Sequence, residues 1–151
     1  MSSISNDQDL RSALENLSIA DQRLLGARFA ASVLNLSGDP RLANVADSAI
    51  EPDITDAERE DAFKSAKSIA VQTYTACGKD ADWSAQAEHF VAMAYAAVLT
   101  PEPQIITKTN LAWKAAIQAR MAKNCAMIEQ DHGEVENEAV KQYEIASDFL
   151  S

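Results

Sequence analysis

Two histidines, His89 and His132, are the residues best suited to metal or acid–base chemistry. Glu129 stands three residues before His132, in the stretch EQDH. This Glu-x-x-His spacing places both side chains on one face of a helix, as di-iron carboxylate bundles require. Such a site needs a second pair of the same kind, but the residue three positions before His89 is Gln86. We therefore predict no metal site and no cofactor.

Other catalytic patterns are missing from the sequence. It contains no HExxH helix, no glycine-rich phosphate loop and no Gly-x-Ser-x-Gly elbow. Cys77 and Cys125 form no CxxC pair, and we interpret them as small apolar side chains on helices of a cytoplasmic protein. A Cys–His pair that only the fold brings together stays open. The sequence thus predicts a protein that is not an enzyme and has no catalytic residues.

The distribution of charge is more informative than any single motif. The net charge is −10, which argues against a nucleic acid or an anionic membrane as the main partner. Acidic side chains cluster around the link into the predicted fourth helix, where a basic protein partner would be steered. The candidate partner-binding residues are Asp53, Asp56, Glu58, Glu60 and Asp61. The alternative is that these carboxylates are merely solvated or complement helix dipoles.

Two further charge clusters have the same pair of interpretations. The last stretch of the chain is acidic and is opposed only by Lys141; its acids are Glu129, Asp131, Glu134, Glu136, Glu138, Glu144 and Asp148. Between Lys108 and Lys123 the balance reverses, with Lys114 and Arg120 and no acid. We interpret both clusters first as solvated helix faces.

Size and composition define the elements that must position these residues. The 151 residues suffice for one helical domain, residues 1–151. Alanine is abundant, no segment alternates in polarity with period two, and hydrophobic residues make up 47%. These features predict an all-α protein. The N-terminal MSSISNDQDL lacks the basic and apolar parts of a signal peptide, so we expect a cytoplasmic location.

Capping signals and apolar spacing place about seven helices. Ser18 with Asp21, and Thr55 with Glu58, resemble capping boxes. The predicted helices span about 7–17, 18–36, 40–51, 55–77, 80–100, 107–131 and 134–150. Short connections favour antiparallel neighbours, so we expect a compact array of helical hairpins. The second helix would pair with the third, the fourth with the fifth, and the sixth with the seventh.

Residues 90–99 form an unbroken run of ten apolar residues. A helix of ten residues spans about 15 Å, half of a bilayer core, so no membrane segment is predicted. A helix that is apolar on all sides is a buried one, and its alanines allow close approach of its neighbours. We predict that this run is the centre of the core. The alternative is a ligand pocket lined by Met93 and Tyr95.

The order of these features resembles a known family. The stretches LSIADQRLLGARFAASVLNL, DPRLANVADSAIEPDITDAEREDAFKSAKSIA, AEHFVAMAYAAVL and AWKAAIQARMA are similar to the fifth family of immunity proteins of bacterial polymorphic toxin systems. The similarity covers roughly residues 17–122. It departs at Arg28–Ser32, where the family pattern leads us to expect a Cys-Ala-Glu-Arg-like stretch, and in its poverty of histidine. The resemblance implies an all-helical fold and a toxin-neutralising function.

Two functions therefore follow as expectations. The first is a non-catalytic binding protein, a cytoplasmic immunity protein that neutralises a basic toxin through its acidic surface. The second is a structural or ligand-binding helical module that forms a homodimer. Its support is the apolar surplus on the fifth and sixth helices, including Trp113, Ile117 and Met121.

Overall fold

The computed structural model describes residues 4–75, 83–130 and 137–151, which fold as helices with no strand among them. The α-helices are α1 (Asp7–Glu15), α2 (Ile19–Ala31), α3 (Pro40–Ala49), α4 (Asp56–Thr75), α5 (Trp83–Leu99), α6 (Leu111–Gln130) and α7 (Glu138–Leu150). Two 3-10 turns, η1 (Leu34–Leu36) and η2 (Glu102–Gln104), lie between them. The predicted all-α array of about seven helices is confirmed.

Local capping chemistry explains where most of these helices begin. The Ser18 hydroxyl accepts a hydrogen bond from the Asp21 N–H at 3.1 Å, and Asp39 accepts one from the Arg41 N–H at 2.9 Å with Pro40 at the first helical position. Such caps satisfy N–H groups that have no partner inside the helix. These starts were foreseen from the sequence.

The start of α6 and the end of α2 differ from the prediction. Lys108 has a φ of 73°, a left-handed conformation that no helix continues through, so α6 begins only at Leu111. Its N-cap is Asn110, whose side chain accepts from the Trp113 N–H at 3.0 Å. The predicted start of this helix near residue 107 is therefore wrong. The α2 helix ends at Ala31 instead of near Leu36, which belongs to the separate turn η1.

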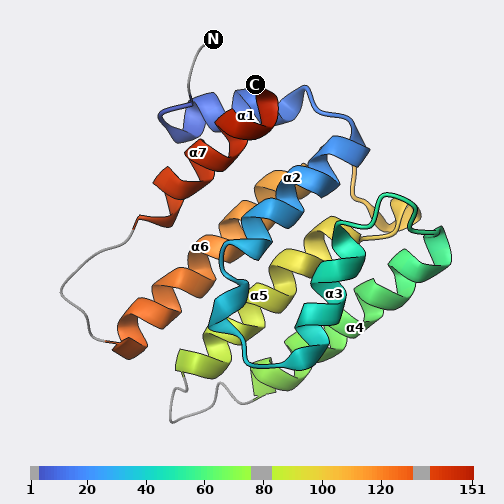
Figure 1. The fold of residues 1–151 in the computed structure, drawn as a ribbon, viewed down its shortest axis with the longest axis vertical. Helices are drawn as coiled ribbons and strands as arrows, with labels where there is room; N and C mark the ends of the chain where they lie inside the picture. The colour runs from blue at the N-terminus through green and yellow to red at the C-terminus, as the bar shows by residue number, and fades with distance from the viewer. Residues whose placement is uncertain (1–3, 76–82, 131–136) are drawn as a thin grey trace.

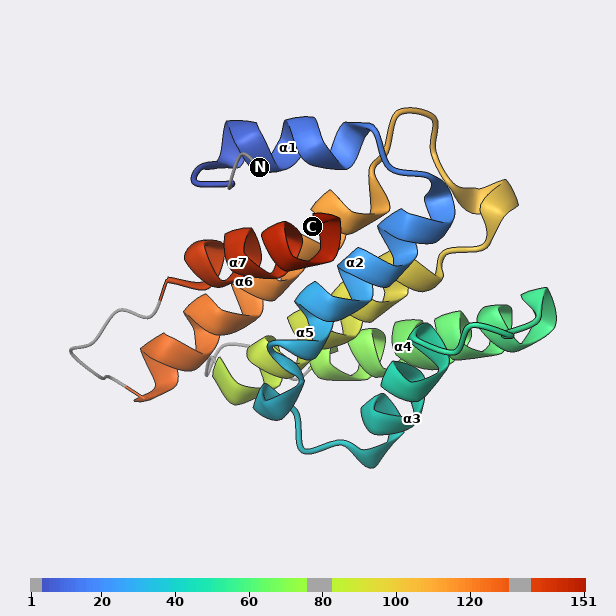
Figure 2. The same ribbon diagram turned by 45° about the horizontal axis from the view of Figure 1, so that its top comes forward.

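The helices form two layers (Figures 1 and 2). One layer contains α4, α5 and α6, and the other contains α3, α2 and α7, while α1 lies across one end. The α5 helix is central and packs most extensively against α6, then against α4 and α2. The predicted pairing of α4 with α5 is thus present, whereas α6 packs mainly on α5 and α2 and only slightly on α7.

The apolar run of α5 is the interior of this arrangement, as predicted. The buried side chains of the run are Val91, Ala92, Ala94, Tyr95, Ala96, Ala97, Val98 and Leu99, and its other two residues are half-buried. Small side chains on the neighbours allow the helices to come close. Gly26 of α2 shows this best, because a Cβ there would collide with Val98 and lie 3.2 Å from the Ala112 backbone.

Arg23 of α2 is a buried cationic residue that caps the C-terminal end of α5. Its guanidinium donates to the carbonyls of Val98 at 2.6 Å and Thr100 at 2.8 Å. The last carbonyls of a helix lack intrahelical partners and carry partial negative charge, so a cation there is favourable. Burial lowers the pKa of Arg23 to about 10, which still leaves the side chain cationic at neutral pH.

No helix within the described residues combines the length and the hydrophobicity needed to cross a bilayer.

Candidate functional site

The candidate partner-binding surface lies where α3 leads into α4. A reciprocal capping box fixes the first turn of α4: the Glu58 N–H donates to the Thr55 hydroxyl at 3.1 Å, and the Thr55 N–H donates to the Glu58 carboxylate at 3.0 Å. The hydrogen bond from the Thr55 N–H lowers the pKa of Glu58. The surface therefore starts from a rigid turn that already holds one ionised carboxylate.

All five predicted carboxylates are exposed: Asp53, Asp56, Glu58, Glu60 and Asp61. Asp56 accepts a hydrogen bond from Arg59 at 3.1 Å, and Glu60 lies 3.6 Å from Lys64. Exposed ion pairs of this kind contribute little, because water and salt screen them. The structure thus brings the predicted residues together at the surface and ties none of them into the core.

Several carboxylates on this surface form no ion pair with any described residue. They are Asp47 of α3, Asp53 of the connection and Asp61 of α4, and all three are exposed. Such a region attracts cationic groups more strongly than one in which each acid has a base beside it.

A groove between α3 and α4 runs through this surface. Its volume is about 320 Å³, and its lining residues are Asn44, Val45, Ser48, Glu58, Asp61, Ala62 and Ser65. Val45 and Ala62 are buried, so the groove has an apolar floor below two exposed carboxylates. A long cationic side chain fits this chemistry, because its methylene groups can lie on the floor while its charged end meets Glu58 and Asp61.

A second polar region joins α1, α6 and α7, and the sequence did not reveal it. Arg120 binds the Asp7 carboxylate with two hydrogen bonds of 3.0 and 2.8 Å, and Tyr143 donates to Asp7 at 2.8 Å. Arg120 also donates to Gln142 at 2.8 Å, and the fully buried Gln142 donates to the Ala116 carbonyl at 2.9 Å. We name these four side chains the Arg120 network. Arg120 is therefore a structural residue and not part of a free basic face.

Glu138 corrects the interpretation of the C-terminal acids as solvated. Its side chain is only 5% exposed, and Oε2 lies 2.5 Å from the Ser32 hydroxyl at the end of α2. Its other oxygen, Oε1, has no hydrogen-bond partner among the described residues. Glu144 and Asp148 are exposed as predicted. Residues 131–136, including His132, and the side chain of Glu129 lie outside what the structure describes.

The surroundings of His89 on α5 show whether Met93 and Tyr95 line one ligand pocket, the alternative offered by the sequence. The Nδ1–H of His89 donates to the Ala70 carbonyl at 2.7 Å, and the ring packs 5.6 Å from Tyr74 and 5.1 Å from Phe90. His89 thereby links α5 to α4. Met93 lines a hollow on the outside of α4 and α5, but Tyr95 is 1% exposed and belongs to the core. The predicted pairing of Met93 with Tyr95 in one pocket is wrong.

The apolar surplus expected on α6 is only partly a free surface. Trp113 is half-buried between two guanidinium groups, those of Arg11 at 5.1 Å and Arg120 at 5.4 Å from its ring centre. Ile117 is half-buried as well, whereas Met121 is 41% exposed. Trp113 therefore stabilises the attachment of α1, and Met121 is the exposed member of the predicted set.

Within the described residues, no three side chains of His, Cys, Asp or Glu lie close enough together to hold a metal ion. Cys125 of α6 is buried, and its sulfur lies 3.8 Å from the Gln86 side-chain oxygen. Cys77 lies outside the described residues. Among the described residues, Cys125 packs with Ala87 and Ala126 in a small apolar cluster.

Comparison of the chain with protein-family models, with curated proteins and with solved structures found no match in any of the three. The resemblance to immunity proteins therefore stays a prediction.

Proposed function

We propose that this protein is a non-catalytic binding protein that holds a basic protein partner on the surface of α3 and α4. The observation that carries the proposal is the set of exposed carboxylates around the α3–α4 groove, three of which no described base neutralises. Unpaired charge of one sign on a rigid scaffold speeds encounter with the opposite sign and selects against acidic partners. The net charge of −10 extends the attraction over a longer distance.

The resemblance of residues 17–122 to immunity proteins supports a more specific form of the proposal. A cytoplasmic immunity protein would cover the active surface of a cognate toxin, and toxins that act on nucleic acid are themselves basic. An acidic blocker competes directly for such a surface. Co-expression and pull-down with the product of the neighbouring gene tests this form. A neighbour without a toxin-like domain, together with no rescue of any toxin, contradicts it.

Charge reversal tests the surface itself. Asp53→Lys with Asp61→Lys changes the net charge by +4 within the candidate surface. Glu15→Lys with Glu144→Lys makes the same change at exposed positions on α1 and α7. We expect the first pair to lower the association rate for the partner about tenfold at low salt and the second pair to lower it far less. Equal losses for the two pairs would show that only overall charge matters.

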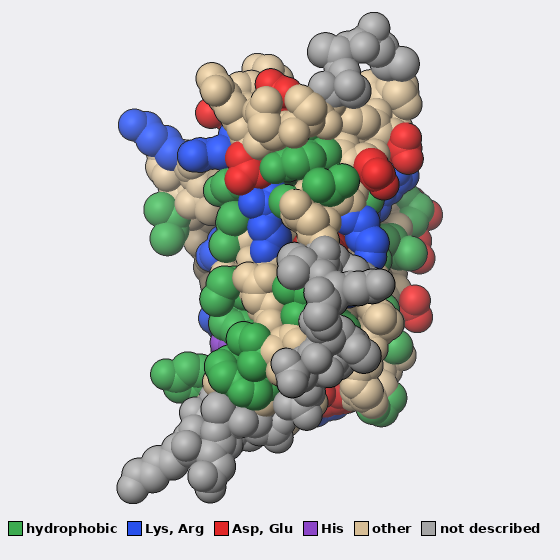
Figure 3. All heavy atoms as spheres, turned by 90° about the vertical axis from the view of Figure 1, so that its left-hand side faces the viewer, with side chains coloured by type: hydrophobic (Ala, Val, Ile, Leu, Met, Phe, Trp, Pro, Cys, Tyr) green, Lys and Arg blue, Asp and Glu red, His purple; other side chains and the backbone are tan. Residues whose placement is uncertain are grey.

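A homodimeric module is the second candidate function, and one observation favours it. Met121 and Ile128 of α6 are 41% and 54% exposed. On the part of the surface that Figure 3 leaves uncovered, hydrophobic side chains lie in separate groups between charged ones. Light scattering of the purified protein, with Met121→Lys as the variant, distinguishes the two functions. A monomer at all concentrations removes the homodimer.

A further inference from the structure

The outer side of α4 contains two adjoining hollows away from the α3–α4 groove. The larger has a volume of about 500 Å³ and is lined by Phe63, Lys64, Lys67, Ser68, Val71 and Gln72. The second has about 320 Å³ and is lined by Lys67, Ala70, Val71, Tyr74, His89 and Met93. Lys67 and Val71 border both, so the hollows form one trough along α4 that reaches α5. Each volume lies in the range of sites for small molecules.

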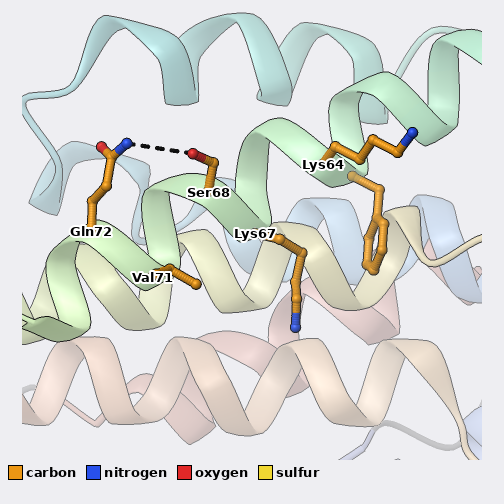
Figure 4. Close-up of a pocket in the computed structure, with 6 residues that line it drawn as sticks. Lys64, Lys67, Ser68, Val71 and Gln72 are labelled. Carbon is orange, nitrogen blue, oxygen red and sulfur yellow. Dashed lines mark hydrogen bonds between the residues drawn. The ribbon is translucent and has the colours of Figure 1, made fainter.

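The charged side chains that line this trough are basic, whereas the net charge of the protein is −10. Among the described residues, no carboxylate lines either hollow, although the chain has 23 acidic and 13 basic residues. Lys64 is 3.6 Å from Glu60, whereas Lys67 forms no ion pair with any described residue. Figure 4 shows Lys67 pointing away from Ser68 and Gln72, which are hydrogen-bonded to each other. Within the described part of the chain, the Lys67 ammonium group therefore borders the trough without a carboxylate partner.

The walls beside Lys67 are apolar and partly fixed in place. Val71 and Tyr74 are 61% and 67% exposed, which is high for such side chains, and Met93 lies across from them on α5. The His89 ring is held by its 2.7 Å hydrogen bond to the Ala70 carbonyl, and it packs against Tyr74. Aromatic and thioether groups around one cation are suited to a flat apolar body with a single negative charge.

We propose that this trough binds a small carboxylic acid with an aromatic or branched apolar body. The carboxylate accepts hydrogen bonds from the Lys67 ammonium group, and the apolar body covers Val71, Tyr74 and Met93. The trough shares no described lining residue with the α3–α4 groove, although its Lys64 pairs with Glu60 of the acidic surface. The two proposals therefore rest on different residues.

The probe for this site is 1-naphthoate, followed by NMR with ¹³C-labelled methionine methyl groups. Met93 lies in the trough, while the exposed Met121 of α6 serves as an internal control. We expect the Met93 methyl resonance to shift and saturate with a Kd on the order of 1 mM, while Met121 stays unchanged. Equal shifts of Met93 and Met121 would overturn the site.

Two matched comparisons test the role of charge. The neutral 1-naphthamide should bind about threefold to fivefold more weakly than 1-naphthoate, because it lacks the ion pair with Lys67. Lys67→Gln should weaken 1-naphthoate by a similar factor and leave 1-naphthamide unaffected, whereas Lys114→Gln at an exposed position of α6 should change neither. If the amide binds as tightly as the acid, or if Lys67→Gln has no effect, recognition of a carboxylate is wrong.

Discussion

Charged side chains are paired in the Arg120 network but largely unpaired, among the described residues, on the α3–α4 surface. In the Arg120 network, the Asp7 carboxylate receives hydrogen bonds from both Arg120 and Tyr143, and Arg120 is further held by Gln142. On the α3–α4 surface, Asp53 and Asp61 have no basic partner among the described residues. Charges of the first kind join distant parts of the chain, and charges of the second kind are available to another molecule.

Because of this difference, we expect the Arg120 network to affect the stability of the fold and the α3–α4 surface to affect binding of the proposed partner. A partly buried charge that loses its partner leaves other polar groups unsatisfied, which costs much more than losing an exposed charge. Substitutions in the Arg120 network should therefore lower the stability of the fold. Substitutions of Asp53 and Asp61 on the α3–α4 surface should change binding of the proposed partner while the fold keeps its stability. Four predictions, from the largest effect to the smallest, test this separation.

Arg120→Ala should have the largest effect, a loss of about 2–3 kcal/mol in the free energy of unfolding. The substitution removes the cationic partner of Asp7 and leaves the buried oxygen of Gln142 without its donor. Urea denaturation followed by circular dichroism measures the loss as a lower midpoint at an unchanged m-value. Lys114→Ala on the same helix is the control and should stay within about 0.5 kcal/mol. Equal midpoints for the two variants would contradict a structural role of the network.

Thr55→Ala should lower stability by about 1 kcal/mol, because it removes the hydroxyl that caps α4. The change leaves every carboxylate of the α3–α4 surface in the sequence. It therefore tests how the cap stabilises α4 without changing the charge of the surface. Thermal unfolding provides the measurement, with Thr107→Ala in the exposed connection before α6 as the control. A Thr55→Ala protein as stable as the control would mean that the capping box does not hold α4.

Asp7 should make stability depend on pH, with a smaller effect. The hydrogen bond from Arg120 lowers the pKa of Asp7 below its ordinary value of 3.8. Because the folded pKa is the lower one, the contribution of Asp7 is fully present above pH 3.8 and is lost as the pH falls through the folded value. About half of the Asp7 side chain is exposed, so solvent screening limits the contribution to about 1 kcal/mol or less.

Unfolding of the wild type and of Asp7→Asn at a series of pH values measures this contribution. We expect the wild type to be the more stable protein at pH 7 and the difference to shrink below pH 3.8. Among the described carboxyl groups, those of Asp39 and Glu58 also have lowered pKa values, but both groups are retained in the two proteins and cancel in the comparison. A difference that is independent of pH would show that Asp7 acts through packing and not through its charge.

The two regions were also unequally visible in the sequence. The exposed acids and the Thr55–Glu58 capping box follow from local order, since caps and first-turn acids act over three or four residues. The burial of α5 follows from its unbroken apolar run. The pair of Arg120 with Asp7, in contrast, joins residues that lie 113 positions apart, and no local pattern announces it.

The burial of Glu138 could have been predicted from residue spacing, but the many acids near it in the sequence led to the prediction that it is exposed. Glu138, Gln142 and Ala146 are spaced by four residues, so they lie on one face of α7, and all three are buried. That spacing could have indicated a polar buried face, but the many nearby acids favoured a solvated one. The late start of α6 had no such signal, because the left-handed Lys108 is not a residue type that favours this conformation.

The smallest effect on stability is expected on the α3–α4 surface, from Asp53→Asn combined with Asp61→Asn. Neither carboxylate has an ion pair with a described residue, so the free energy of unfolding should change by about 0.5 kcal/mol or less. Any change should be toward higher stability, because neutralising two acids reduces the net charge from −10 to −8 and with it the self-repulsion. Urea denaturation at low and high salt measures this, since salt screens repulsion and should remove the gain. A destabilisation comparable to that of Arg120→Ala would show that these carboxylates hold the fold together, and the contrast between the two regions would fail.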